Sequence, residues 1–356
     1  MRSRTRSLLV AALISLTALA GCSRAAESPA PQQAATGPAA ELRLGYFPNI
    51  THAPALIGDA KGFFAEELGA TKLTTQQFNA GPDEVSALLG GSLDAGFIGS
   101  SPAINAFAKS NGQAIRLIAG STSGGAQLVT TPDITAPEQL KGKIIATPQL
   151  GNTQDVALKK WLKENGLEIG EGPDRVTVQN LDNPRTLDLY RSGEIAGGWL
   201  PEPWSSRLVD AGAHVLVDEK TLWPGGQFPT TVLIVRTEFL QQHPETVEAL
   251  LRGEQKAIDF AQNNQAEAKT VTNDAIKEFT GSSLSPAVLD RAFSELSFSS
   301  DPLAATFPQL SKDSVTAGAQ QKEVDLNGFV DLTALNNVRQ AAGLPAVDAA
   351  GLDEQG

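Results

Sequence analysis

The chain has 356 residues, with 28 Lys and Arg against 40 Asp and Glu, and a formal net charge of −12 at pH 7. Removing residues 1–21, which hold three arginines and no acidic residue, moves this charge from −12 to −15. Such an acidic chain argues against nucleic acid as a partner. The single cysteine, Cys22, excludes an intramolecular disulfide.

The N-terminal segment is predicted to be a secretory signal. Three arginines precede the apolar stretch 8–20, which is too short to span a bilayer comfortably and ends in small residues. The sequence Leu19-Ala20-Gly21-Cys22 resembles the bacterial lipobox, in which the cysteine becomes the lipid-modified first residue after cleavage. We therefore expect residues 1–21 to be a signal peptide and Cys22 to be lipidated. An ordinary signal peptide with an incidental cysteine is the alternative.

Residues 22–40 are predicted to be a flexible tether behind this lipid anchor. They are rich in Ala, Pro, Ser and Gln, and they lack the apolar residues needed to bury a core. The part of the chain that follows is longer than one hydrophobic core normally holds, so two lobes are expected.

One local pattern recurs along this folded part: a short apolar strand, a cluster of small polar residues, and then a helix. Short strands that alternate with helices are typical of an α/β fold with mainly parallel sheets. Ligands of such sheets bind beyond the carboxyl ends of the strands. In the second cluster, Ser101 is the expected helix N-cap and Pro102 suits the first turn. The five clusters are residues 48–54, 99–102, 120–125, 147–153 and 201–204.

These clusters could simply be good helix caps, but five in succession favour a ligand cleft. Small residues and the free N–H groups of a first helical turn form an anion site that needs no arginine. His52 lies in the first cluster, whereas His214 and His243 are expected to be structural or surface residues. No metal-ligand spacing, nucleophile elbow, phosphate loop or dinucleotide fingerprint is present, so we expect a non-enzyme without metal or cofactor.

Four segments carry a resemblance to a known family: "GYFPNITHAPALIG", "FNAGPDEVSALLGGSLDAGFIGSSPAINAF", "IATPQLGNTQDVALKKWL" and "WLPEPWSSRLV". In this order they resemble the nitrate/taurine/alkanesulfonate group of ABC-transporter substrate-binding proteins, most of all the aliphatic sulfonate binders. The resemblance implies a two-lobed, type II-like periplasmic-binding-protein fold with a hinge. By similarity, lobe one holds 41–125 and 231–356, with the C-terminal helices packed on it, and lobe two holds 126–230.

The resemblance also implies a function. The protein is expected to capture a small organic anion, an aliphatic sulfonate, and to deliver it to a membrane permease and its ATPase from the extracytoplasmic face of the cell membrane. Taurine, nitrate, a thiamine-pyrimidine precursor and an aromatic carboxylate stay open as ligands. A sensory lipoprotein and an enzyme that uses His52 as a base stay open as other classes. A positively charged side chain would favour nitrate binding, and Arg185 could supply one from outside the first cluster.

The expected ligand contacts come from both lobes. Hydroxyl and amide groups would hold the anion. Each of the two tryptophans could wall the organic tail or belong to the core, and Glu202 could pair with an amino group. The expected residues are Asn49, Thr51, His52, Ser100, Ser101, Gln149, Asn152, Thr153, Trp199, Glu202 and Trp204.

Overall fold

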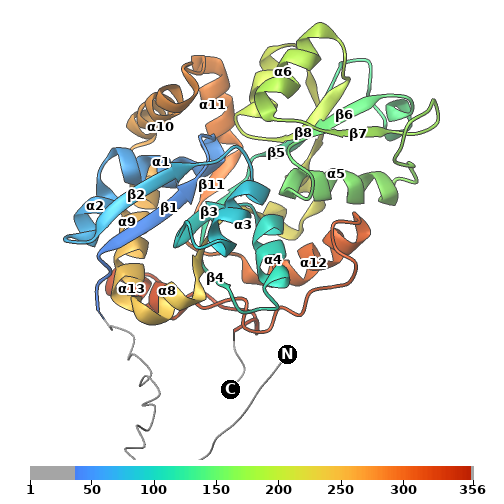
Figure 1. Ribbon diagram of the computed structural model, residues 1–356. Helices are drawn as coiled ribbons and strands as arrows, with labels where there is room; N and C mark the ends of the chain where they lie inside the picture. Colours follow the sequence, from blue (N-terminus) through green and yellow to red (C-terminus); the bar gives the residue numbers. More distant parts are fainter. Residues whose placement is uncertain (1–36, 354–356) are drawn as a thin grey trace, which may run out of the picture. The chain divides into compact units, whose positions relative to one another are not determined.

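The computed structural model describes residues 37–353 of the chain (Figure 1). The predicted signal peptide, Cys22 and most of the predicted tether lie outside the described residues. Within residues 37–353, no helix is long and apolar enough to cross a membrane.

The first sheet, sheet A, has six strands in the order β11-β4-β10-β3-β1-β2. Strand β1 pairs in parallel with β2 and with β3. Strand β10 runs antiparallel between β3 and β4, and β11 is antiparallel to β4. The strands are β1 (Glu41–Tyr46), β2 (Lys72–Gln77), β3 (Ala95–Ile98), β4 (Ile115–Gly124), β10 (Pro229–Arg236) and β11 (Leu296–Phe298).

The second sheet, sheet B, has five strands in the order β7-β6-β8-β5-β9. Strand β6 pairs in parallel with β7 and β8, and β5 runs antiparallel between β8 and β9. The strands are β5 (Ala126–Thr130), β6 (Ile144–Thr147), β7 (Thr177–Asn180), β8 (Gly197–Pro201) and β9 (His214–Asp218).

The two sheets with their helices confirm the predicted α/β, two-lobed fold. The expectation of mainly parallel sheets was wrong, because both sheets are mixed. The physical reason is the route of the chain: it leaves sheet A by β4 into β5 and returns by β10, and β5 and β10 both run antiparallel to their neighbours.

The first passage between the sheets takes place at a glycine pair. Strand β4 ends at Gly124 and β5 begins two residues later. Gly124 and Gly125 have φ of 81° and 71°, a left-handed conformation that glycine adopts without steric cost. The return passage ends at Pro229, where β10 begins. The lobe boundaries implied by the family resemblance stay a prediction.

Helices cover the faces of both sheets (Figure 1). The long helix α9 packs against α1 and α2 of lobe one, whereas α11 and α12 also contact α7 and α5 of lobe two. The α-helices are α1 (Ala53–Ala60), α2 (Phe63–Leu68), α3 (Gly81–Leu89), α4 (Ser100–Lys109), α5 (Thr153–Glu164), α6 (Asn183–Ser192), α7 (Trp204–Asp210), α8 (Thr237–Gln242), α9 (Pro244–Asn263), α10 (Gln265–Thr280), α11 (Pro286–Ser294), α12 (Phe307–Thr316) and α13 (Thr333–Ala341). The short 3-10 turns are η1 (Ile50–His52), η2 (Pro137–Leu140), η3 (Glu219–Leu222), η4 (Pro224–Gly226) and η5 (Ala304–Thr306).

Sheet B is buried on both faces, which decides where its side chains point. Leu128 and its cross-strand partner Trp199 belong to one hydrophobic cluster, while the next residues, Val129 and Leu200, belong to another. This is the period-2 alternation of a strand with two covered faces.

Candidate ligand-binding cleft

A narrow polar cavity of ≈ 20 Å³ lies where the two lobes meet. This volume is about enough for a single water molecule, so a larger ligand can enter only if the lobes move apart. Both lobes and the return strand β10 contribute to the wall. The lining residues are Phe47, Asn49, Thr51, His52, Asn79, Gly99, Asn152, Thr153, Gln154, Asn183, Pro201, Thr230 and Thr231.

Two lining side chains of lobe one have their acceptor atoms occupied by neighbours. The Oδ1 atom of Asn49 accepts a hydrogen bond from the indole Nε1 of Trp204 at 2.9 Å. The Nδ1 atom of His52 accepts from the backbone N–H of Phe47 at 3.3 Å. Asn49 therefore offers its amide N–H₂ group, and a neutral His52 offers its Nε2–H as the ring's donor.

Burial keeps this imidazole neutral. The His52 side chain is 2% exposed, and its ring lies 4.3 Å from that of Phe47. Burial lowers the pKa of His52 to about 3, because a charged imidazolium would lose its hydration. His52 is thus a hydrogen-bond donor to the cavity without being a cation near neutral pH.

Lobe two presents the starts of two helices to the same cavity. Asn152 is the N-cap of α5, and its Oδ1 accepts from the N–H of Thr153 at 2.9 Å. Asn183 is the first residue of α6. The first N–H groups of a helix have no partner within the helix, and the helix dipole makes this end attractive to an anion.

The lining contains no formal charge within the described part of the chain, since it holds no Lys, Arg, Asp or Glu. Arg185, considered above as help for nitrate, is exposed and does not line the cavity. Three lining residues, Thr153, Asn183 and Thr231, have buried side-chain oxygens without a hydrogen-bond partner among residues 37–353. Buried polar atoms usually find a partner, so their clustering here is the pattern of a site built for a polar ligand.

The structure brings Asn49, Thr51, His52, Asn152 and Thr153 together in this cavity, as the strand-to-helix clusters suggested.

The two serines of the second cluster stand next to the cavity and not in its lining. Helix α4 begins at Ser100 with Gly99 as its N-cap, so the prediction of Ser101 as the N-cap was wrong. The helix starts earlier because Gly99 has an ordinary extended conformation there, and its C=O accepts from the N–H of Ala103. Both serine hydroxyls are buried and, within the described residues, have no partner.

Gln149 and Glu202 are occupied elsewhere. The Nε2 atom of Gln149 donates to Asp83 of α3 at 2.8 Å, which links the two lobes beside the cavity. The buried Glu202 carboxylate accepts from Arg291 of α11 at 3.0 Å and from the N–H of Ser206 at 3.2 Å. Burial raises the pKa of Glu202 despite this neighbouring guanidinium. The idea that Glu202 pairs with an amino group of the ligand is therefore corrected: its partner is Arg291.

Neither Trp199 nor Trp204 lines the cavity. Trp199 is fully buried in the core of lobe two, packs edge-on against Trp161, and donates its indole N–H to Glu219 at 2.8 Å. Trp204 lies behind Asn49 and holds that side chain in place.

Several lining residues were missed by sequence reasoning. Asn183 follows strand β7 in the same strand–polar–helix pattern, so the pattern itself could have identified it. Asn79 follows β2 in a similar way. Thr230 and Thr231 lie inside the apolar strand β10, and only the tertiary structure places them beside the first cluster.

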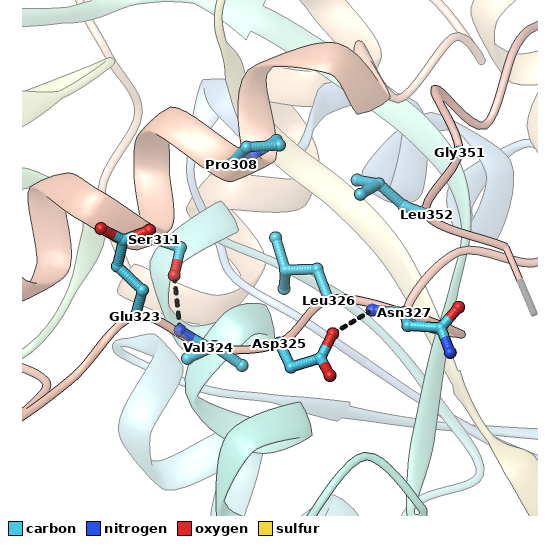
Figure 2. A pocket seen from close by; sticks show the side chains of 9 residues that line it. All are labelled: Pro308, Ser311, Glu323, Val324, Asp325, Leu326, Asn327, Gly351 and Leu352. Carbon is cyan, nitrogen blue, oxygen red and sulfur yellow. Dashed lines mark hydrogen bonds between the residues drawn. The ribbon is translucent and has the colours of Figure 1, made fainter.

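A larger, open pocket of ≈ 520 Å³ lies between α12 and segments 323–327 and 351–352 (Figure 2). It shares no lining residue with the cleft. Its polar groups bond to one another: Ser311 Oγ accepts from Val324 N–H at 2.9 Å, and Asp325 accepts from Asn327 N–H at 3.1 Å (Figure 2). In the described part of the chain, no group of three His, Cys, Asp or Glu side chains is placed to hold a metal ion.

Comparison with curated proteins gives relatives that are named as binding proteins. The chain is 32% identical to the taurine-binding periplasmic protein of Escherichia coli (strain K12) over 212 residues, which cover 59% of this chain and 62% of that protein. It is 27% identical to a putative binding protein of Brucella abortus (strain 2308) over 239 residues, covering 66% and 72%. The match thus spans less than two thirds of the E. coli protein.

Solved structures share the fold. The alkanesulfonate-binding protein SsuA from Xanthomonas axonopodis pv. citri, bound to MOPS, matches with a TM-score of 0.67 and 20% identity, over 81% of this chain and 97% of that one. The periplasmic nitrate-binding protein NrtA from Synechocystis PCC 6803 matches with a TM-score of 0.70 and 17% identity, over 87% and 91%.

The family model described as NMT1-like matches residues 35–273, about two thirds of the chain and both sheets except β11. These matches confirm the resemblance to the taurine, sulfonate and nitrate binders that the four sequence segments suggested. The chain belongs to the NMT1-like family.

Proposed function

We propose that this protein is the extracytoplasmic substrate-binding component of an ABC importer and captures a small organic anion. The observation that carries the proposal is the cleft, which combines hydrogen-bond donors from both lobes with helix N-termini and has no charged side chain among the described residues that line it. The names of the relatives support it, because they bind taurine, alkanesulfonates or nitrate.

An aliphatic sulfonate is the ligand that we propose. A sulfonate stays ionised at neutral pH and offers three acceptor oxygens, which suit the donors of Asn49 and His52 and the hydroxyls of Thr51 and Thr153. Hydrogen bonds to an ionised group are stronger than those between neutral groups. Nitrate is smaller and would benefit from a cation, which the lining does not supply.

The working cycle that we propose begins with the lobes apart. The anion then binds, and contacts made from both lobes favour the closed state. The closed protein presents the ligand to a permease and its ATPase, while an acylated Cys22 holds it at the membrane. This cycle includes no chemical step and no cofactor.

The proposal is tested by thermal-shift and calorimetric titration of the purified protein with alkanesulfonates, taurine, nitrate, an aromatic carboxylate and a thiamine-pyrimidine precursor. A ligand at a hundredfold excess over its Kd should stabilise the folded state by about 2.7 kcal/mol. Stabilisation by a sulfonate supports the assignment. Stabilisation by only one of the other anions would keep the binding function and replace the ligand, and no response to any anion would overturn the proposal.

A further inference from the structure

A second cavity, of ≈ 140 Å³, lies at the hinge and is bounded by both strands that pass between the lobes. Thr122 of β4 and Thr231 of β10 form its inner wall, and these two residues are cross-strand partners in sheet A. Segment 297–303 closes the other side. We call this space the hinge cavity. Thr231 also lines the ligand cleft, so this residue borders both cavities.

The inner wall carries two hydroxyl groups for which residues 37–353 supply no hydrogen-bond partner. Thr122 is 3% exposed and Thr231 is 1% exposed. Neither Oγ1 atom has a hydrogen-bond partner among the described residues. A buried hydroxyl without a partner is destabilising, so a cavity with two of them is shaped for a polar occupant.

The outer wall is fixed in place by the backbone. Gly120 donates its N–H to Ser300 C=O at 2.8 Å, and a Cβ atom at Gly120 would lie only 2.1 Å from the carbonyl oxygen of Asp301. This close approach seats Asp301 against β4. Its Oδ1 accepts from the N–H of Leu303 at 2.8 Å.

The lining of the hinge cavity is rich in hydroxyl and amide groups, which can accept hydrogen bonds as well as donate them. Besides the two threonines, Ser297, Ser299 and Gln227 contribute hydroxyl and amide groups. Among the described residues that line it, Asp301 is the only charged one. An alkyl end would leave the buried hydroxyls unsatisfied, whereas a hydroxyl or ammonium group could donate to them.

We propose that the hinge cavity is a subsite for the far end of the ligand and selects a short anion whose chain ends in a hydrogen-bond donor. This inference rests on the proposed function, because it assumes that the anionic head lies in the cleft. The head group would then bind the donors of the cleft, and the chain would pass Thr231 to reach the hydroxyl-lined space.

Titration calorimetry of the purified protein with three ligands of similar size tests this inference. Propanesulfonate ends in a methyl group, hydroxyethanesulfonate in a hydroxyl, and aminoethanesulfonate in an ammonium. We expect at least one of the two donor-ended ligands to bind about tenfold more tightly than propanesulfonate, the typical effect of one hydrogen bond to a buried polar group. Asp301→Asn distinguishes the two donors, because it should weaken only the ammonium ligand.

Thr122→Val should remove the preference for the donor-ended ligands over propanesulfonate. Propanesulfonate itself should bind as well as before or better, because valine keeps the shape of the threonine side chain and lacks its hydroxyl. Thr272→Val is the matched control: Thr272 is another buried threonine with an unpartnered hydroxyl, located on α10 and outside both cavities. It should leave all three affinities unchanged.

Equal affinity of the wild-type protein for all three ligands would overturn the subsite and leave the proposed function standing, and this comparison depends on no variant. A preference that survives Thr122→Val would also overturn it. If none of the three sulfonates binds, the assignment of a sulfonate as the ligand fails, and the subsite fails with it, whereas the binding function is decided by the other anions of the thermal-shift screen.

Discussion

At the scale of single residues, the neighbours of a polar side chain determine what it can offer a ligand. Trp204 occupies the acceptor of Asn49, and the N–H of Phe47 occupies that of His52. Both side chains are thereby turned into oriented donors, the kind of group that an ionised sulfonate needs. Because the His52 imidazole is buried, it donates without carrying charge near neutral pH.

This neutral state predicts a sulfonate affinity that does not change between about pH 5.5 and 8. An imidazole with an ordinary pKa near 6.5 would gain a positive charge below that pH and bind the anion more tightly. Burial lowers the pKa of His52 to about 3, so no such gain is expected. Calorimetry at several pH values measures this directly. An affinity that rises as the pH falls through 6.5, and that becomes flat in His52→Gln, would contradict it.

The same pKa shift has a consequence for stability. The folded pKa lies below the unfolded one, so the contribution of His52 is complete above pH 6.5 and is lost as the pH falls toward 3. The loss should approach about 1.4 kcal/mol per pH unit in the unfolding free energy. Urea unfolding of the wild type and of His52→Gln separates this slope from that of the other titrating groups.

At the scale of elements, the closed cleft depends on how closely two helix starts approach each other. Gly99 precedes α4 in lobe one, and Thr153 begins α5 in lobe two. A Cβ atom at Gly99 would lie 2.4 Å from Thr153 Oγ1, well inside van der Waals contact. The backbone of Gly99 itself is unstrained, with φ of −69° and ψ of 153°. Glycine is therefore needed there to let Thr153 come close, and not to allow a special backbone conformation before α4.

Gly99→Ala should therefore hinder closure without unfolding lobe one. We expect sulfonate affinity to fall by about tenfold or more, since a displacement of the lobes disturbs several hydrogen bonds at once. Small-angle X-ray scattering should show less compaction on ligand addition than in the wild type. Thr153→Ala is the contrast, because it removes the protein hydroxyl proposed to contact the sulfonate and adds no steric obstacle. The affinity of this variant for sulfonate should fall while ligand-induced compaction persists. Normal compaction and affinity in Gly99→Ala would rule out this role for the glycine.

At the scale of the whole molecule, the two lobes are also joined by contacts outside the cavity. Arg291 of α11 donates to Glu202, to Ser206 at 2.7 Å and to Gln127 at 2.5 Å, all in lobe two. This cluster lies beside the glycine passage, because Glu202 N–H also donates to Gly125 C=O at 2.8 Å. The C-terminal helices thus do more than cover lobe one, since α11 reaches across to the other lobe.

The predicted lipid anchor belongs to the same scale, because it would decide where the molecule works. Replacing Cys22 with Ser should release the protein from the membrane fraction and leave its thermal unfolding unchanged, since Cys22 precedes the folded residues. Fractionation followed by carbonate washing of the membranes measures this. A Cys22→Ser variant that stays in the washed membranes would show that the attachment does not depend on the cysteine.

The sequence by itself determined the local part of the site. Capping residues and strand periodicity are encoded within a few neighbours, so the clusters around Asn49 to His52 and around Asn152 could be predicted, and both line the uncharged cavity. Asn183 carried the same local signal. The four family segments added the two-lobed fold.

Only the tertiary structure decided which groups line the cavity. Thr231 reaches the cleft because β10 returns to sheet A beside β3, and Glu202 pairs with Arg291, a residue on the distant helix α11. Trp199 and Trp204 both belong to hydrophobic core clusters, yet only Trp204 also donates its indole N–H to Asn49 of the cleft. The physical reason is that strand order and hydrogen-bond pairing join residues far apart in the chain, and local propensity carries no information about such partners.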